Sequence, residues 1–150
     1  MNNDVLFEKN LPVFIALNAK RFEEWWDPKK IPPSIGWAIV RYCSDKFDIW
    51  WKSGRIPVEG NRYEFTRYCS KNFEKWYTPE AFPPSKMFWL ALYCPEHFDL
   101  WWDPDRYPPE DARFLAMGCL DHYKKWSKYM KISAIRKHCG KDNTNTMAFA

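Results

Sequence analysis

Apolar and polar residues follow one another with helical spacing in several short segments of this chain. In "SDKFDIWW", residues 44–51, the apolar side chains Phe47, Trp50 and Trp51 stand at i, i+3 and i+4, with charged residues among them. Residues three and four apart share one face of a helix, so the segment predicts a short amphipathic helix with one aromatic stripe. Turn-forming residues follow the stripe at Asp27-Pro28, Gly54, Thr78-Pro79 and Asp103-Pro104.

The aromatic stripe recurs at intervals of 25 or 26 residues. An aromatic ring begins each copy, at Phe22, Phe47, Phe73, Phe98 and Tyr123. A tryptophan stands three positions later in every copy, at Trp25, Trp50, Trp76, Trp101 and Trp126. The following position varies more, as Trp26, Trp51, Tyr77, Trp102 and Ser127. Because so many residue types keep one register, the chain contains an internal repeat.

The repeat divides the chain into five units and two ends. The predicted units are 11–31, 32–56, 57–82, 83–107 and 108–132. Residues 1–10 are expected to form an N-terminal cap. Residues 133–150 are expected to form a basic C-terminal cap or tail, whose end is a candidate for disorder.

Each unit is predicted to begin with another helix, ahead of the aromatic stripe. It starts at the prolines and ends near a cysteine, as in "PPSIGWAIVRYC", residues 32–43. One apolar position of this helix is occupied in every unit, by Phe14, Ile39, Phe65, Leu90 and Leu115. From Met87 to Cys94 nearly every residue is apolar, which predicts a helix packed on all sides. Ser44 and Ser70 are predicted N-caps of the second helix, and Pro95 fits its first turn.

Two short helices in each unit predict an all-α fold. Stacked side by side, about five such helical hairpins make a short, right-handed α-solenoid. Strand repeats of similar length require a leucine-rich pattern with period-two alternation, which this sequence lacks. In period and in helix pairing, residues 11–132 resemble HEAT-like and leucine-rich-repeat-variant solenoids. The resemblance implies an extended surface that works by binding.

The composition predicts a single packed domain of 150 residues, because 46% of them are hydrophobic and 19% are aromatic. No apolar run approaches the ~20 residues of a membrane span. The first ten residues lack the basic and apolar regions of a signal peptide. We therefore expect no membrane contact and a cytoplasmic location in the producing or host cell.

The cysteines and histidines are the first candidates for chemistry. Cys43, Cys69, Cys94 and Cys119 share one repeat position, so each lies ~8–10 Å from the next, too far for a disulfide. We expect them to be small buried apolar residues, and Cys139, outside the register, to be a free thiol. His97 and His122 also share a phase, on the predicted solvent face. Surface placement is favoured for them over a metal or pH site, and we expect neither metal nor cofactor.

The carboxylates give no catalytic pattern. Asp48 and Asp99 recur in phase, whereas acid–base catalysis needs two carboxyl groups in different environments. Asp27 and Asp103 precede prolines and suit turns. The sequence contains no GxGxxG, P-loop, GxSxG or HExxH motif. We therefore predict that the protein is not an enzyme.

Arginines and aromatic residues give a candidate protein-binding surface. Arg41 and Arg67 share a phase at which later units have Leu92 and Met117, so this surface changes from basic to apolar along the chain. Arginine and aromatic side chains are favoured at protein interfaces. The alternative is that both arginines merely extend past the core into solvent. The predicted protein-binding residues are Arg41, Arg67, Trp26, Trp51, Tyr77 and Trp102.

Nucleic acid is the alternative partner. Within a net charge of +4, basic residues gather near the C-terminus, and the segment from His122 to Lys141 has no acid. The candidates for phosphate contacts are Lys124, Lys125, Lys128, Lys131, Arg136 and Lys137. Acidic residues interrupt the first four units, which is unfavourable for a phosphate track there.

The sequence therefore predicts a non-catalytic protein–protein interaction module. An adaptor, or an inhibitor that occludes a site on another protein, suits a small chain of repeats. An accessory protein of a virus or mobile element fits the same description. The partner's identity and the oligomeric state stay open.

Overall fold

The computed structural model describes the backbone of residues 3–140 and the side chains of residues 10–138. Within this range the regular secondary structure is helical and there is no strand, which confirms the predicted all-α class. The α-helices are α1 (Asn3–Leu17), α2 (Phe22–Trp25), α3 (Gly36–Tyr42), α4 (Phe47–Trp50), α5 (Arg62–Tyr68), α6 (Phe73–Trp76), α7 (Phe88–Tyr93), α8 (Phe98–Trp101), α9 (Arg113–Gly118), α10 (Tyr123–Trp126) and α11 (Ile132–Ile135). The chain forms two compact units, Met1–Trp76 and Tyr77–Ala150.

Short 3-10 turns connect these α-helices. Five of them begin with proline, which suits the first helical position because it has no N–H to donate: Pro28–Lys30, Pro33–Ile35, Pro79–Ala81, Pro84–Lys86 and Pro95–His97. The others are Ala19–Arg21, Ser44–Lys46, Trp51–Ser53, Ser70–Asn72, Leu120–His122 and Ser127–Tyr129, and a π-helical turn spans Arg136–Gly140. The prediction for Pro95 is confirmed, and the last ten residues of the predicted tail lie outside the described range.

The segment predicted as each second helix is a 3-10 turn followed by a single α-helical turn. In the second repeat these are Ser44–Lys46 and α4. The N-cap prediction for Ser44 and Ser70 is wrong, because each is the first residue of its 3-10 turn and a cysteine holds the cap position. A stripe at i, i+3 and i+4 needs only one turn, so it does not distinguish a long helix from this arrangement.

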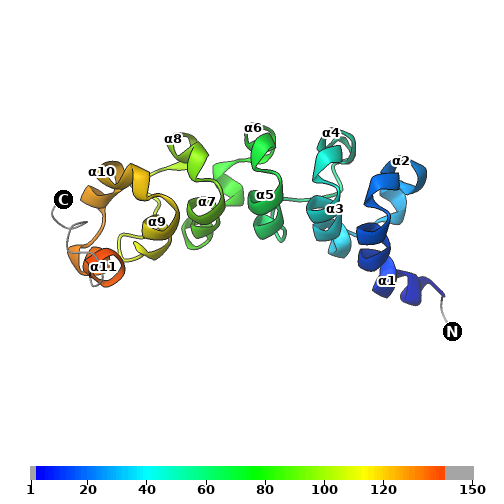
Figure 1. The fold of residues 1–150 in the computed structure, drawn as a ribbon, viewed down its shortest axis with the longest axis horizontal. Coiled ribbons are helices and arrows are strands. Elements are labelled where there is room, and N and C mark those ends of the chain that lie inside the picture. Colours follow the sequence, from blue (N-terminus) through cyan, green and yellow to red (C-terminus); the bar gives the residue numbers. More distant parts are fainter. Residues whose placement is uncertain (1–2, 141–150) are drawn as a thin grey trace. The chain divides into compact units, whose positions relative to one another are not determined.

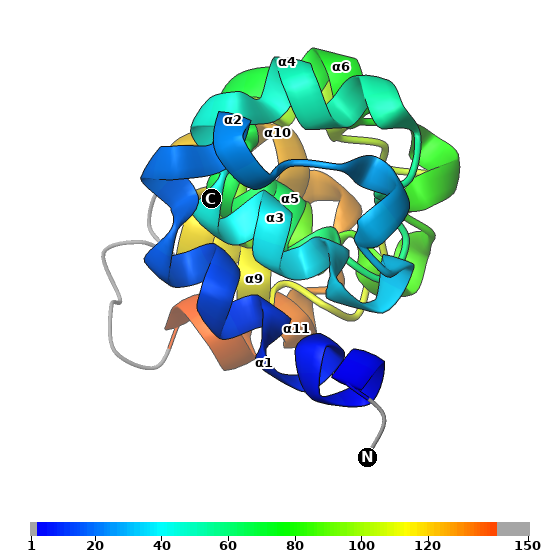
Figure 2. The same cartoon turned by 90° about the vertical axis from the view of Figure 1, so that its right-hand side faces the viewer.

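The first unit, Met1–Trp76, has two layers of helices. Helix α3 packs against α1 and α5, so these three helices form one layer. Helices α2, α4 and α6 form a second layer on one side of it in both views (Figures 1 and 2). Ile39 and Phe65 are fully buried at the predicted apolar position, whereas Phe14 is 39% exposed. The predicted N-terminal cap is continuous with the first repeat, since α1 runs without interruption through Pro12.

The second unit, Tyr77–Ala150, has the same local arrangement. Helix α7 packs against α9, and the turn Arg136–Gly140 also contacts α9 (Figure 1). Leu90 and Leu115 are fully buried, as predicted. The expectation that Met87–Cys94 is buried on all sides is wrong for Phe88, Trp89, Leu92 and Tyr93, which are half-buried. The Phe88, Trp89 and Tyr93 rings instead pack against one another. The Phe88 and Trp89 centroids are 4.4 Å apart.

One side-chain hydrogen bond is repeated in all five copies. The indole Nε1–H of each invariant tryptophan donates to the backbone carbonyl seven residues earlier: Trp25 to Asn18 (2.7 Å), Trp50 to Cys43 (2.7 Å), Trp76 to Cys69 (2.7 Å), Trp101 to Cys94 (2.9 Å) and Trp126 to Cys119 (2.8 Å). The accepting carbonyl belongs to the residue that follows the first helix. It also accepts the backbone N–H of the residue three positions later, so the indole uses its second lone pair. Tryptophan suits this position because it combines a large apolar body with one donor.

The invariant tryptophans are buried, with one exception. Trp50, Trp76, Trp101 and Trp126 are at most 2% exposed, whereas Trp25 is only partly buried. Trp50 is flanked by the Phe65 ring of the following repeat, at 5.8 Å between centroids. Trp25 meets the partly exposed Phe14 ring of its own repeat at the same distance, 5.8 Å, and an exposed neighbour covers it less well.

The four cysteines that share a repeat position are buried and free, which confirms the predicted packing role. Burial raises the pKa of the Cys43, Cys69 and Cys119 thiols to about 12. The Cys119 sulfur lies 3.4 Å from the Ala91 carbonyl oxygen of the preceding repeat. The predicted free thiol, Cys139, lies outside the side chains that the structure describes.

Gly118, the last residue of α9, is required by the same close approach. A Cβ at this position would lie 1.9 Å from the Ala91 carbonyl oxygen and 2.9 Å from its carbon. Such contacts are with backbone, which cannot turn aside as a side chain can. Glycine therefore permits the contact between α9 and α7, whereas the equivalent residues of the three preceding repeats are Tyr42, Tyr68 and Tyr93.

Candidate protein-binding site

Two of the predicted binding residues, Arg41 and Arg67, meet on one aromatic ring in the first unit. Each is the second-last residue of its helix, and α3 packs beside α5. The Arg41 guanidinium carbon lies 5.6 Å from the centroid of the Tyr68 ring, and that of Arg67 lies 5.8 Å from it. Arg41 is also 5.3 Å from the Tyr42 ring. Both arginines are exposed, so the rings hold two guanidinium groups at the surface.

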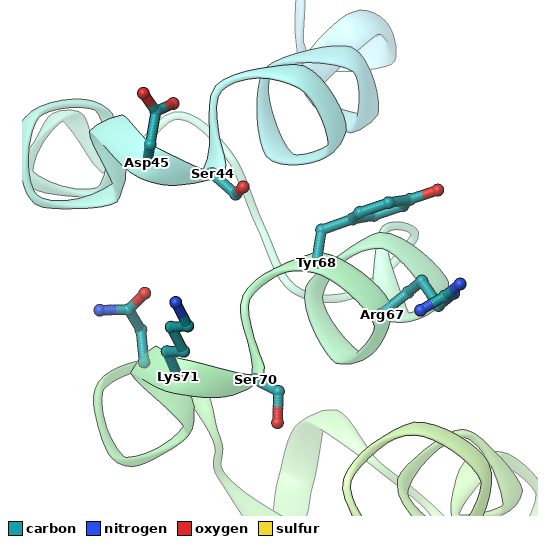
Figure 3. A pocket seen from close by; sticks show the side chains of 7 residues that line it. Ser44, Asp45, Arg67, Tyr68, Ser70 and Lys71 are labelled. Carbon is teal, nitrogen blue, oxygen red and sulfur yellow. The ribbon is translucent and has the colours of Figure 1, made fainter.

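A polar pocket adjoins this cluster of arginines and tyrosines. Its volume is about 300 Å³, and it is lined by Ser44, Asp45, Arg67, Tyr68, Ser70, Lys71 and Asn72. The lining comes from two segments, 44–45 and 67–72. Lys71 extends from the second segment toward the first, while the Asp45 carboxylate points away from Lys71 (Figure 3). The lining contains no histidine or cysteine. The lysine, arginine and hydroxyl side chains of the lining offer positive charge and hydrogen-bond donors.

The second tryptophan of each pair is part of a different cluster. Trp26, Trp51 and Trp102 are half-buried and stack on the ring that begins their own repeat, at 5.1, 5.3 and 5.3 Å from Phe22, Phe47 and Phe98. Tyr77 is half-buried too and packs against Phe82 at 5.9 Å. All four rings are thus partly buried, and their predicted binding role stays a prediction. One face of each stacked ring is already occupied by its own chain.

The second unit has an apolar surface at the position of the two arginines. Leu92 is half-buried there, and Met117 is 68% exposed. The Phe114 ring lies 4.9 Å from Phe88, and the Arg113 guanidinium lies over Phe114 at 4.2 Å. The predicted difference between a basic and an apolar surface thus holds when each unit is considered by itself.

The residues predicted to contact nucleic acid, all exposed, lie in and after α10. Lys125 forms an ion pair with Asp99 at 2.7 Å, and Lys131 pairs with Glu110 at 3.1 Å. Lys128 lies 5.3 Å from the Tyr129 ring. Lys124 in α10, and Arg136 and Lys137 in the π-helical turn, complete the set. Two of the six charges are therefore compensated by carboxylates of the same unit.

The remaining candidates have local structural contacts. The Asp27 carboxylate accepts a hydrogen bond from the Lys29 backbone N–H at 3.0 Å, and Asp103 accepts one from Asp105 at 2.9 Å, which confirms their turn roles. His122 is half-buried rather than on the solvent face, because its ring stacks on Phe98 at 4.3 Å. His97 is half-buried beside Glu96, 3.7 Å away. Among residues 10–138, no three His, Cys, Asp or Glu side chains form a metal-binding group.

The prediction from sequence missed Tyr68 and Lys71. Tyr68 contacts both arginines, and Lys71 lines the pocket between the turn Ser44–Lys46 and the end of α5 with its following turn. The sequence contains a pattern that could have identified Tyr68, because Tyr42, Tyr68 and Tyr93 share the position before a repeat cysteine. Lys71 has one basic counterpart, Lys20 in the first repeat, whereas the equivalent residues Asp45, Glu96 and Asp121 are acidic, so the pattern does not single it out.

In comparisons with known proteins, no family model matches the chain, and neither a curated protein nor a solved structure matches it significantly. The fold and the candidate site describe an all-α chain with an internal sequence repeat. In its first unit the chain has a surface of arginine and tyrosine side chains. No described helix is long and apolar enough to cross a membrane.

Proposed function

We propose that this chain is a non-catalytic protein-interaction module, an adaptor or an inhibitor that occludes a site on another protein. The observation that carries the proposal is the pair of exposed arginines on Tyr68 beside a polar pocket. Arginine and tyrosine are the side chains most enriched where binding energy concentrates in protein interfaces. Guanidinium groups already positioned by a ring lose less conformational entropy when a partner binds.

We also propose that the repeats form a short α-solenoid of about five helical hairpins. The supporting observations are local: the tryptophan-to-carbonyl hydrogen bond recurs in each repeat, and successive first helices pack together within each unit. A row of such helices presents equivalent positions side by side, which brings Arg41 next to Arg67. The wider expectation of a viral or mobile-element accessory protein stays a prediction.

An affinity capture experiment tests the interaction. The immobilised protein is incubated with native lysate of the cell that produces it, and bound proteins are identified by mass spectrometry. We expect one protein in stoichiometric amount, lost when Arg41→Glu and Arg67→Glu are combined. The matched control combines Lys29→Glu and Lys30→Glu, which make the same charge change at exposed positions of the same unit.

Two outcomes would contradict the proposal. Capture that survives the arginine double variant would remove this surface as the binding site. Equal loss in the lysine control would show that total charge, and not this site, determines capture.

A further inference from the structure

The surface around Tyr68 has positive charge that its own unit does not compensate. Two lysines of the first unit form ion pairs between repeats, Lys46 with Glu23 at 2.5 Å and Lys75 with Asp48 at 2.7 Å. Among the described residues, Arg41 and Lys71 form no such ion pair, and both are exposed. The unit thus neutralises Lys46 and Lys75 and leaves positive charge at Arg41, near the end of α3, and at Lys71, in the turn Ser70–Asn72.

The pocket beside these cations suits a small anionic group. Lys71 and Arg67 are both among the lining residues, and so is Ser44. Lys71 extends toward the segment of Ser44 and Asp45, whereas Arg67 extends to the other side, next to Tyr68 (Figure 3). The carboxylate of Asp45 points away from Lys71 (Figure 3). A volume of about 300 Å³ exceeds what one carboxylate needs and leaves room for the side chain that carries it.

The charges favour an acidic peptide over a nucleic acid at this place. A phosphate backbone needs a continuous track of cations. Here the basic cluster is interrupted by a carboxylate, because Asp45 belongs to the same pocket lining as Arg67 and Lys71. A peptide carries separate carboxylates, which can pair with the cations and avoid the neighbouring acids.

We propose that the occupant of this surface is an acidic segment of a partner protein. One of its carboxylates enters the pocket beside Lys71, and another pairs with Arg41 or Arg67 on the Tyr68 ring. Arginine holds carboxylates through two parallel hydrogen bonds, which gives this second contact its geometry. The inference rests on the proposed function and names the chemistry of the partner.

Fluorescence anisotropy with defined probes tests this chemistry. The probe is a fluorescein-labelled peptide of alternating Glu and Gly residues, and its match is the same peptide with Gln in place of Glu. A labelled single-stranded DNA is the third probe. We expect the Glu peptide to bind, the Gln peptide to bind at least about tenfold more weakly, and added salt to weaken the Glu complex.

Matched variants locate the binding. Arg67→Glu combined with Lys71→Glu is expected to raise the Kd of the Glu peptide about tenfold or more. Lys29→Glu combined with Lys30→Glu changes the net charge equally and is expected to leave the Kd within about twofold. All four positions are exposed, so both variants are expected to fold. Far-UV circular dichroism checks this.

Three results would overturn the inference. The first is no binding of the Glu peptide, and the second is an equal loss of affinity in the two double variants. The third is DNA binding that is tighter than binding of the Glu peptide and is lost in Arg67→Glu with Lys71→Glu. The proposed function has a separate readout. If the captured partner is lost in the Arg41→Glu, Arg67→Glu variant but the Glu peptide does not compete for it, the interaction module stands and the acidic segment is wrong.

Discussion

Trp50 and Trp51 are neighbours in sequence, and both rings contact Phe47 and Phe65, but they differ in burial. Trp50 is fully buried, and its indole donates to the Cys43 carbonyl at 2.7 Å. Trp51 is half-buried and stacks on Phe47, with the rings inclined by 16°. Trp50 therefore contributes to the stability of its repeat, and Trp51 is the one whose side chain is accessible to a partner.

Truncation of the two tryptophans separates these roles. Trp50→Ala is expected to lower the free energy of unfolding by ~3–5 kcal/mol, because a large buried ring is lost. Trp50→Phe keeps a ring but removes the hydrogen bond to the Cys43 carbonyl. That hydrogen bond accounts for about 1 kcal/mol of the expected loss in the free energy of unfolding. Trp51→Ala is expected to cost less than Trp50→Ala. Urea denaturation followed by circular dichroism measures all three, and a small loss for Trp50→Ala would refute the core assignment.

At the scale of elements, the contact between α7 and α9 depends on one missing side chain. Gly118 ends α9 where the Ala91 backbone passes, and Cys119 next to it packs on the same carbonyl. Helix propensity alone favours alanine over glycine by ~1 kcal/mol. The close approach reverses this preference, since the added methyl group would overlap backbone atoms.

Gly118→Ala tests which effect is larger. We expect a net loss of ~1–3 kcal/mol in the free energy of unfolding, as in other overpacked sites. Met117→Ala is the control, because it produces the same residue at the adjacent, 68% exposed position of the same helix. A Gly118→Ala variant as stable as the parent chain would show that α7 and α9 move apart without cost.

The boundaries of the elements show what the sequence pattern can and cannot predict. Periodicity identifies the repeat, the buried tryptophans and the buried cysteines, because each rests on which residues share a face. It does not predict that a 3-10 turn precedes each one-turn helix such as α4. Both conformations place i and i+3 on one side, and the choice between them depends on backbone hydrogen bonds. The indole bond to Cys43 depends on the same chain path.

At the scale of the whole molecule, the buried thiols connect stability with pH. Burial raises the pKa of Cys43, Cys69 and Cys119 from 9.0 to about 12. Above about pH 9 the unfolded chain releases thiol protons that the folded chain keeps until about pH 12. The unfolded state then binds fewer protons, so the free energy of unfolding falls as the pH rises through this window.

Urea denaturation between neutral pH and pH 11 measures this effect. We expect the midpoint to fall steadily above about pH 9, and to fall less steeply when the three cysteines are replaced by alanine. Burial also raises the pKa of Tyr107, so the alanine variant retains part of the slope. Identical slopes in the two proteins would show that the thiols do not contribute.

The candidate site was predictable in part. The arginine pair follows from a shared repeat position, which also explains why α3 and α5 bring the two side chains together. Tyr68 and Lys71 needed the structure, because their importance lies in contacts and in a pocket between helices. The half-buried aromatic side of α7 was missed for a similar reason: composition cannot show which apolar residues cover one another at a surface.

The hydrogen bonds from the five invariant tryptophans give each repeat its own reporter. Every indole N–H ends on a carbonyl of the same repeat, from Trp25 on Asn18 to Trp126 on Cys119. An indole proton exchanges with solvent only when its local hydrogen bond opens. Five indole resonances therefore allow the opening of each repeat to be followed without any added label, and Trp25, the least buried, marks the end of the chain where opening is easiest.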